Sequence, residues 1–370
     1  MKLLLLSTSL TVGGAERQVL DLCQKFYEYR PDIQIILVSL THQLEFTLPN
    51  IPNLKLVEYK THKSSPFSLI RSFFRLRKLI AQEKPDIVHS HMVHANLCAR
   101  LLRLVVTIPR LICTAHNKYE GGKLRMLAYR LTDRLADVTT NVSQEASETF
   151  VKLKAVPPQR IMTVYNGIDT QRFCRDDEIR VAMRHALAIT TDTFVFLAVG
   201  RLTPAKDYPT MLKAFDIVAK THAHVRLLIA GTGPWKAQIE NSISQMACAN
   251  RIQLLGLRQD IPNLINAADS FLLSSAWEGF PLVILEAMAT ERLVIASDAG
   301  GTREALDPHG WLVPTHSPIA LAKAMSEAMM LTSAERTQRG KANRQRVKDL
   351  FSLDTISQQW LTLYQSPKPN

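Results

Sequence analysis

The chain has 370 residues, of which 46% are hydrophobic, 7% aromatic and 21% charged, with a formal net charge of +12 at pH 7. This length suits two domains of roughly 170 to 190 residues, and no uninterrupted apolar run approaches the ~20 residues that span a bilayer. An integral membrane protein is therefore excluded. The five cysteines are odd in number and widely spaced without a Cys-x-x-Cys pair, which argues against a disulfide framework and favours a reducing cytoplasm.

The positive charge is concentrated in the first half of the chain. Up to Tyr165 there are 23 Lys and Arg against 13 Asp and Glu, and after it 22 against 20. A basic face of this kind suits anionic lipid head groups, phosphorylated acceptors or nucleic acid.

Short apolar runs alternate with helical patterns throughout, which predicts βα repeats and a parallel sheet in each half. The runs predicted as strands in the first half are Leu3–Leu6, Ile33–Leu40, Ile87–His89, Leu111–Ala115, Val138–Asn141 and Ile161–Val164. Those in the second half are Phe194–Val199, Val225–Ala230, Ile252–Leu254, Ser270–Leu273, Leu293–Ala296 and Gly310–Val313. The predicted fold class is α/β, with two Rossmann-like, doubly wound domains facing a cleft.

The predicted domain boundary lies near Asn166, where a polar and charge-rich stretch begins. The first domain then covers residues 1–165 and the second covers 166–351. The last segment, 352–366, has the pattern of an amphipathic helix that ends before Pro367.

A glycine turn, Gly13-Gly14-Ala15-Glu16-Arg17, follows the first predicted strand and precedes a helical pattern. Because glycines lack side chains and a helix N-terminus attracts anions, this turn suits close approach of a phosphate or sugar. A plain βα turn has the same sequence features, so both interpretations stay open. Glu16 of this turn is a candidate for facing the acceptor.

The segment Phe67–Lys84 has the pattern of a basic amphipathic helix. Its apolar face carries Leu69, Phe73, Leu76 and Ile80, and its opposite face carries Arg71, Arg75 and Lys78. A helix that packs on the core and exposes its basic face to water has the same pattern. Because the whole first half is basic, we predict that this helix docks on an anionic membrane surface.

Four histidines of the first half, His89, His91, His94 and His116, invite a metal-site interpretation. Successive strand residues point to opposite sides, so we expect His89-Ser90-His91 to aim only some rings at one point. No Asp-x-Asp pair or tight group of oxygen ligands is available for a divalent ion. We expect no metal and no other cofactor.

The segment Gly200-Arg201-Leu202-Thr203-Pro204-Ala205-Lys206-Asp207 leaves a predicted strand of the second half and enters a helix. It places the cations Arg201 and Lys206 at the carboxyl edge of the sheet, where ligands of open α/β sheets bind. Two cations at that edge can hold a diphosphate and stabilise its charge as it leaves. Two solvated surface cations would give the same pattern.

Glu278-Gly279-Phe280-Pro281-Leu282-Val283-Ile284-Leu285-Glu286 follows another predicted strand, with Pro281 expected at the first helical position. A loop carboxylate and a helical carboxylate can converge here. Glu286, one turn into the helix, suits the paired hydroxyls of a ribose or sugar ring. A capping Glu278 and a solvated Glu286 form the structural alternative.

With Ala287-Met288-Ala289 and the stretch from Ser297 to Glu304, this segment resembles the signature of retaining glycosyltransferases of family 4, which have the GT-B fold. The resemblance implies that Lys206 and Arg201 hold the donor diphosphate, that Glu278 bonds the donor sugar and that Glu286 bonds the ribose. It implies a donor-binding role for these further residues: Gly13, Gly14, Gly231, Arg258, Gly279, Phe280, Pro281 and Leu282. His116 matches a family position near the reacting sugar, and the C-terminal helix 352–366 is expected to pack back on the first domain.

Two departures from the family pattern stand out. Similar enzymes have glycine where this chain has Asp207, and their usual Cys-Gly-x-Pro is replaced here by Thr290-Glu291-Arg292-Leu293. Neither change removes a proposed site residue.

The sequence thus predicts a cytoplasmic, metal-independent, retaining glycosyltransferase that is peripheral on the inner face of the cytoplasmic membrane. The expected donor is a nucleotide-sugar, with UDP preferred over GDP, and the expected acceptor is a lipid-linked or lipopolysaccharide-type glycan. The alternatives are a sugar-nucleotide epimerase of the same fold, a basic nucleic-acid-binding protein and a catalytically silent scaffold. Intact Lys206, Glu278 and Glu286 argue against the scaffold, and a nucleic-acid-binding protein would be indifferent to Glu286→Ala.

Overall fold

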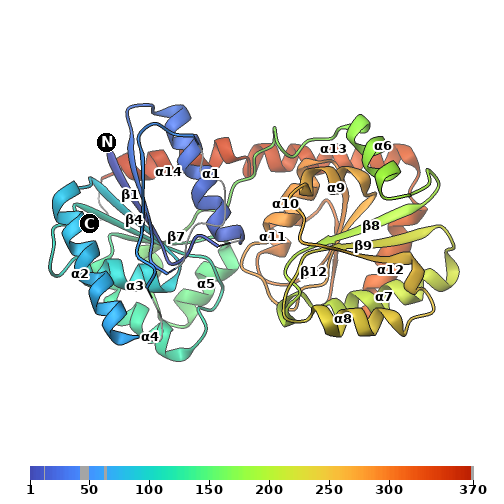
Figure 1. The fold of residues 1–370 in the computed structure, drawn as a ribbon, viewed down its shortest axis with the longest axis horizontal. Coiled ribbons are helices and arrows are strands. Elements are labelled where there is room, and N and C mark those ends of the chain that lie inside the picture. The colour runs from blue at the N-terminus through green and yellow to red at the C-terminus, as the bar shows by residue number, and fades with distance from the viewer. Residues whose placement is uncertain (12, 42–49, 62–64, 368–370) are drawn as a thin grey trace. The chain divides into compact units, whose positions relative to one another are not determined.

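The computed structural model describes residues 1–11, 13–41, 50–61 and 65–367. The chain divides into two compact units, the first formed by residues 1–167 with 353–370 and the second by residues 168–352. Each unit is a parallel sheet with helices on both faces (Figure 1). The first segment of the first unit ends at residue 167, two residues after the predicted end of the first domain at residue 165.

The N-terminal unit contains a sheet of seven parallel strands in the order β3-β2-β1-β4-β5-β6-β7. Its inner strand β1 is buried on both faces because Leu3 and Leu5 enter one core while Leu4 and Leu6 enter the other. The strands are β1 (Lys2–Ser7), β2 (Gln34–Ser39), β3 (Leu54–Glu58), β4 (Ile87–His91), β5 (Arg110–Ala115), β6 (Val138–Asn141) and β7 (Ile161–Thr163).

The helices of this unit cover both faces of the sheet (Figure 1). Helices α1 (Gly14–Tyr29) and α14 (Leu353–Gln365) pack over the Leu3 and Leu5 side. Helices α2 (Pro66–Glu83) and α3 (Val93–Leu102) pack over the Leu4 and Leu6 side. Helices α4 (Lys123–Thr132) and α5 (Gln144–Lys152) enclose a smaller core around Tyr129 and Phe150.

The C-terminal helix α14 belongs to the N-terminal unit. Asp354 at its start accepts hydrogen bonds from the Lys25 ammonium at 3.0 Å and the Tyr29 hydroxyl at 2.7 Å, both from α1. Its aromatic residues Trp360 and Tyr364 are buried in the same core. Helix α14 therefore closes one face of the first sheet.

The C-terminal unit contains six parallel strands in the order β10-β9-β8-β11-β12-β13. The strands are β8 (Phe194–Val199), β9 (Val225–Ala230), β10 (Ile252–Gly256), β11 (Ser270–Leu273), β12 (Leu293–Ser297) and β13 (Trp311–Val313). The helices are α6 (Asp177–Ala186), α7 (Tyr208–Thr221), α8 (Lys236–Ser244), α9 (Ile261–Ala267), α10 (Leu282–Ala289), α11 (Thr302–Leu306), α12 (Pro318–Met330) and α13 (Ser333–Leu350). Because β9 and β10 lie on one side of β8 while β11 to β13 lie on the other, strand order reverses between β8 and β11.

All predicted strands are present, but the edge strand β3 was not predicted. Its sequence Leu-Lys-Leu-Val-Glu is only partly buried, so it lacks the continuous apolar run of the inner strands. Pro281 was predicted as the first helical residue. In the structure it is the N-cap residue, and α10 begins one residue later, at Leu282.

Candidate functional site

The loops that leave β8 and β11 lie side by side at the carboxyl edge of the second sheet. These strands are neighbours at the point of reversal, which is where ligands of open α/β sheets bind. The β8 loop runs through the short 3-10 helix η3 (Pro204–Lys206), and the β11 loop runs from Ser274 to Pro281. The Ala276 amide donates to the Ala205 carbonyl at 2.8 Å, so the two loops are joined through their backbones.

The centre of this site is an ion pair between Lys206 and Glu278. The Lys206 ammonium lies 2.6 Å from Oε1 of Glu278, and their side chains are 19% and 14% exposed. The Ser275 hydroxyl donates to the same Oε1 at 2.6 Å. A cation and an oriented carboxylate are thus held together, half-buried, at the edge where a ligand binds.

Two glycines allow the site loops to approach each other closely. At Gly231, with φ of 149°, a Cβ would lie 1.9 Å from the Gly200 carbonyl oxygen. At Gly300, with φ of 57°, a Cβ would lie 2.1 Å from the Glu278 carbonyl oxygen. Only glycine fits these positions, because both the space and the backbone angle exclude a side chain.

Two residues that depart from the family pattern adopt left-handed backbone angles. Asp207 has φ of 44° and Glu291 has φ of 58°, which explains why glycine is usual at both places. The Asp207 carboxylate caps α7 by accepting from the Thr210 amide at 3.4 Å, and it also accepts from the Thr210 hydroxyl at 2.8 Å. Its Oδ2 lies 2.7 Å from Nδ1 of His316. The Asp207 carbonyl accepts from the Ser274 hydroxyl at 3.0 Å, which fixes the turn that follows Lys206.

The Arg201 side chain is exposed, and Glu286 is half-buried in the second turn of α10. Arg258 forms a bidentate ion pair with Asp260, which lies two residues later in the same loop, with distances of 2.7 and 2.5 Å. In the loop before α10, the Gly279 carbonyl accepts from the Gly301 amide at 3.0 Å. Of the remaining predicted donor residues, Phe280 and Pro281 are buried and Leu282 is half-buried.

In the N-terminal unit, Gly13 is the N-cap residue of α1 and Gly14 is its first residue. A Cβ on Gly13 would lie 2.4 Å from the Glu16 carboxylate, which itself accepts from the Ser9 hydroxyl at 3.0 Å. Glu16 therefore contacts the loop between β1 and α1.

The histidine arrangement differs from the prediction for β4. His89 and His91 are two residues apart and so point to the same side, with ring centroids 4.1 Å apart. His91 Nδ1 lies 3.1 Å from His116 Nε2, because the register places His91 beside Thr114 of β5. Three rings therefore gather.

Burial lowers the pKa of each of these histidines. The pKa falls to about 3 for His89 and about 4 for His116, and well below its usual value for His91. All three are therefore neutral at pH 7. Among the described residues, no three His, Cys, Asp or Glu side chains are grouped so as to hold a metal ion.

Sequence reasoning missed Ser275 and Glu120. Ser275 lies between the strand and the first glutamate of the predicted motif, and serine alone carried no signal. Glu120 is 5% exposed, and burial raises the pKa of its carboxyl group to about 7. Its position four residues after His116 was the available signal.

The predicted basic side chains of α2, Arg71, Arg75 and Lys78, are exposed. Its predicted apolar face is packed only in part, since Leu76 and Ile80 are buried while Leu69 is 47% exposed. None of the helices in the described ranges combines the length and apolar character that a bilayer crossing requires.

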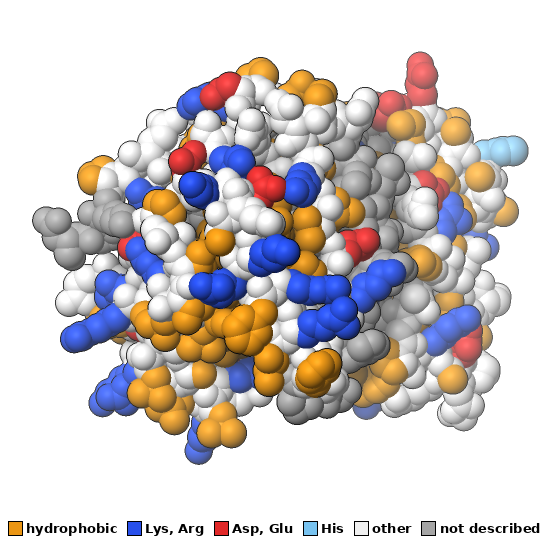
Figure 2. All heavy atoms as spheres, turned by 60° about the vertical axis from the view of Figure 1, so that its left-hand side comes forward, with side chains coloured by type: hydrophobic (Ala, Val, Ile, Leu, Met, Phe, Trp, Pro, Cys, Tyr) orange, Lys and Arg blue, Asp and Glu red, His pale blue; other side chains and the backbone are white. Residues whose placement is uncertain are grey.

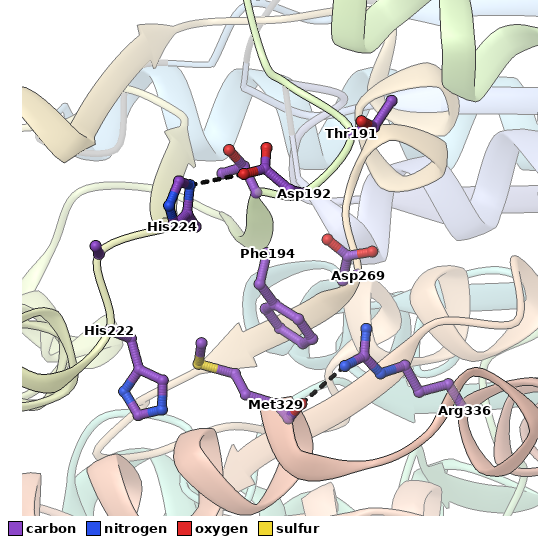
Figure 3. Close-up of a pocket in the computed structure, with 10 residues that line it drawn as sticks. Thr191, Asp192, Phe194, His222, His224, Asp269, Met329 and Arg336 are labelled. Carbon is purple, nitrogen blue, oxygen red and sulfur yellow. Dashed lines mark hydrogen bonds and ion pairs between the residues drawn. The ribbon is translucent and has the colours of Figure 1, made fainter.

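A shallow cavity of about 330 Å³ lies at the opposite edge of the second sheet (Figure 3). Its lining includes residues that begin or precede β8, β9 and β11, such as Phe194, His224 and Asp269. The polar groups there bond to one another, as His224 does to Asp192 at 2.8 Å and Arg336 to the Met329 carbonyl at 2.8 Å (Figure 3). This cavity is remote from the carboxyl edge and lacks the predicted residues.

Two family models match the chain, one in each half. The model described as Glycosyltransferase Family 4 matches residues 12–172, and the model described as Glycosyl transferases group 1 matches residues 180–346.

Two curated relatives match different shares of the chain. The chain is 31% identical over 242 residues to the UDP-Gal:alpha-D-GlcNAc-diphosphoundecaprenol alpha-1,3-galactosyltransferase of Escherichia coli, which covers 63% of this chain and 62% of that enzyme. It is 25% identical to the N-acetyl-alpha-D-glucosaminyl L-malate synthase of Bacillus anthracis over 96% of this chain and 94% of that enzyme. The chain thus spans less than two thirds of the length of the E. coli relative.

Solved structures share the fold. Anabaena HepE in complex with UDP has a TM-score of 0.82 and 22% identity, covering 99% of this chain and all of that chain. Sucrose-phosphate synthase from Thermosynechococcus elongatus has a TM-score of 0.85 and 19% identity, covering 99% and 98% of the two chains.

Proposed function

This chain belongs to family 4 of the glycosyltransferases and has the GT-B fold, and on that premise we propose that it transfers a sugar from a nucleotide-sugar to a glycan hydroxyl. UDP is the preferred nucleotide, the transfer retains the anomeric configuration, and no divalent metal takes part. The observation that carries the proposal is the Lys206–Glu278 pair at the strand reversal of the second sheet.

The chemistry of that pair fits a departing nucleoside diphosphate. Negative charge builds on the diphosphate as the sugar–oxygen bond breaks, and a fixed cation at that point stabilises the transition state. Lys206 supplies that cation, the exposed Arg201 adds a second, and Glu278 with Ser275 beside it offers hydrogen-bonding oxygens to the sugar hydroxyls. Glu286 of α10 bonds the ribose hydroxyls.

In the proposed reaction, the bond between the sugar C1 and the diphosphate oxygen breaks. The acceptor hydroxyl attacks C1 from the face that the diphosphate leaves, and its proton passes to the departing phosphate oxygen. The new glycosidic bond and free UDP are the products. Lys206 neutralises the UDP charge during this exchange and needs no proton transfer of its own.

The nucleotide preference is supported by the E. coli relative, whose name gives UDP-Gal as its donor. The same name includes a diphosphoundecaprenol acceptor, so a lipid-linked glycan is the acceptor class proposed here. Such acceptors lie at a membrane, and we place the protein in the cytoplasm, peripheral on the inner face of the cytoplasmic membrane.

Helix α2 supports membrane contact. Beyond its basic residues, it exposes Phe67, Leu69, Ile70 and Phe74, which are 76%, 47%, 56% and 59% exposed. Apolar side chains next to exposed arginines suit the boundary between lipid head groups and acyl chains.

The test is sugar transfer by the purified chain. A panel of UDP-sugars and GDP-sugars is supplied with N-acetylglucosamine-diphospho-lipid as acceptor, with EDTA present, and wild type is compared with Lys206→Gln. The proposal is supported if wild type transfers sugar from a UDP-sugar in EDTA and the variant loses this activity. The anomeric coupling constant of the product should show the same configuration as that of the donor sugar. A product of inverted configuration would refute retention, and a requirement for added metal would refute metal independence. Conversion of the UDP-sugar without any acceptor product would refute sugar transfer.

A further inference from the structure

Helix α4 has two apolar faces, of which only one is packed. Met126 and Tyr129 are buried in the core, whereas Leu124, Leu127 and Leu131 are 82%, 47% and 75% exposed. The three leucines lie at positions i, i+3 and i+7, so they form one stripe along the helix. We call this stripe the α4 ridge.

The α4 ridge belongs to a basic and apolar surface. Just after α3, Leu104 and Val105 are 65% and 46% exposed, and the Arg77 guanidinium of α2 donates to the Val105 carbonyl at 3.0 Å. Helices α3 and α4 contain no Asp or Glu, and the one in α2, Glu83, is paired with Lys2 and Lys55. Figure 2 shows apolar side chains lying among Lys and Arg on a face of the N-terminal unit.

A hollow of about 500 Å³ lies at the C-terminal end of the α4 ridge. Its charged lining residues are Arg130, Arg134, Lys154 and Asp133. Asp133 is 5% exposed and already bonded by the Arg160 guanidinium at 2.6 Å, so its charge is offset. The hollow is therefore cationic at its rim.

The remaining lining of the hollow is mainly apolar. It consists of Leu131, Val151, Ala155, Val156, Pro157 and Pro158. The hollow thus offers cations and apolar walls together, which is the combination presented by a phosphate head group with its first acyl carbons.

The hollow does not belong to the histidine cluster of the same unit. Its residues 133–134 and 157–158 precede β6 and β7, at the amino edge of the sheet, whereas His91 and His116 lie at the carboxyl ends of β4 and β5. A head group held here is therefore not the acceptor in its reacting position.

We infer that the hollow binds the phosphate head group of an anionic lipid while the α4 ridge enters the bilayer interface beside it. The inference rests on the lipid-linked acceptor proposed above and adds a second, non-reacting lipid site on α4 to the contact made by α2. A second copy of this chain fits less well, because pairing two such surfaces would bring like charges together.

The experiment is co-sedimentation with vesicles of phosphatidylcholine alone or with 30% phosphatidylglycerol added. The hollow variant carries Arg130→Gln, Arg134→Gln and Lys154→Gln, and the ridge variant carries Leu124→Ser, Leu127→Ser and Leu131→Ser. The matched control removes three exposed cations of the C-terminal unit through Lys213→Gln, Lys341→Gln and Lys348→Gln. Circular dichroism confirms that each variant is folded.

We expect wild type to bind only vesicles that contain phosphatidylglycerol. Each basic residue near the surface strengthens binding severalfold, so the hollow variant should bind at least tenfold more weakly, as should the ridge variant, while the control stays within twofold. Equal loss in the control, or no loss in the hollow variant, overturns the site. Displacement from vesicles by millimolar inorganic phosphate would assign a free-phosphate site, and oligonucleotide binding lost only in the hollow variant would assign nucleic acid; either overturns the lipid site.

These readouts are independent of catalysis. UDP-dependent stabilisation without vesicle binding refutes the lipid site alone, whereas vesicle binding without UDP-dependent stabilisation or transfer refutes the proposed function alone.

Discussion

The ammonium of Lys206 and Oε1 of Glu278 lie 2.6 Å apart, although the two residues come from different loops separated by 72 positions in the chain. The pair is mostly buried and is held by Ser275 and by the backbone bond between the two loops. In the proposed reaction, such a pair would couple diphosphate binding to sugar binding, because Lys206 engages the diphosphate and Glu278 engages the sugar.

Replacing Lys206 should abolish most of the activity without unfolding the protein. Removing one electrostatic donor to a developing charge typically costs 10²- to 10³-fold in kcat, and we expect this range for Lys206→Gln. Glu278→Gln should also lower kcat, and the double variant should lose less than the sum of both because they act as one unit. Steady-state transfer assays check this, with the exposed Lys213→Gln as control; additive losses would contradict the coupling.

The free energy of unfolding should distinguish two glycines with similar backbone angles. Gly256, with φ of 68°, has nothing within 4 Å of an added Cβ, so Gly256→Ala should cost only about 1 kcal/mol of backbone strain. Gly300→Ala adds a clash with the Glu278 carbonyl oxygen and should cost about 3 kcal/mol or more. Urea titrations measure both, and equal costs would show that the approach of Gly300 to Glu278 is looser than described.

The two residues in place of family glycines should respond differently to glycine. Glu291→Gly should stabilise the protein by about 1 kcal/mol, because it relieves a left-handed angle and loses only a long ion pair with Arg175 at 3.7 Å. Asp207→Gly relieves the same strain but removes the α7 cap, so we expect little net change, while Asp207→Ala should destabilise by about 2 kcal/mol. Thermal unfolding of the three variants ranks them; a stabilising Asp207→Ala would refute the capping role.

Glu120 should make stability depend on pH between about 4.5 and 7. Its pKa is raised from 4.5 to about 7 by burial, so over that interval the folded chain keeps a proton that the unfolded chain releases. The free energy of unfolding is therefore unaffected by Glu120 ionisation below pH 4.5. It falls as the pH rises from 4.5 through 7, where the buried carboxyl group must lose its proton.

The variant Glu120→Gln removes this titration. It should match wild type at pH 4 and be more stable by about 3 kcal/mol at pH 8, while the buried histidines, which titrate in the opposite sense, cancel from the difference. Urea unfolding across pH measures it, with the exposed Glu148→Gln as control. A difference that is flat with pH would refute the burial of the Glu120 charge.

The sequence was sufficient for elements with a strong local pattern. Buried strands such as Phe194–Val199 are continuous apolar runs, and the order of strands and helices followed from their alternation. The convergence of Lys206 with Glu278 was predictable as a shared sheet edge. Their direct pairing was not, because it depends on loop conformations set by Gly300 and Ser275.

Other features depended on register and tertiary packing. His91 meets His116 only because β4 and β5 pair with His91 beside Thr114, which no local pattern specifies. Likewise, periodicity placed Leu69 on the packed face of α2, yet the core ends before it, and it is left 47% exposed.

The measurement that tests the central claim most directly is thermal stabilisation of the purified protein by UDP, GDP, ADP and their sugars without added metal, in wild type and Glu286→Ala. We predict stabilisation by UDP and by UDP-sugars in wild type, at about 4 kcal/mol when the ligand is present at 1,000 times its Kd, and its loss in the variant. Absence of stabilisation by every nucleotide in folded wild-type protein, or equal stabilisation of the variant, would contradict the donor site proposed here.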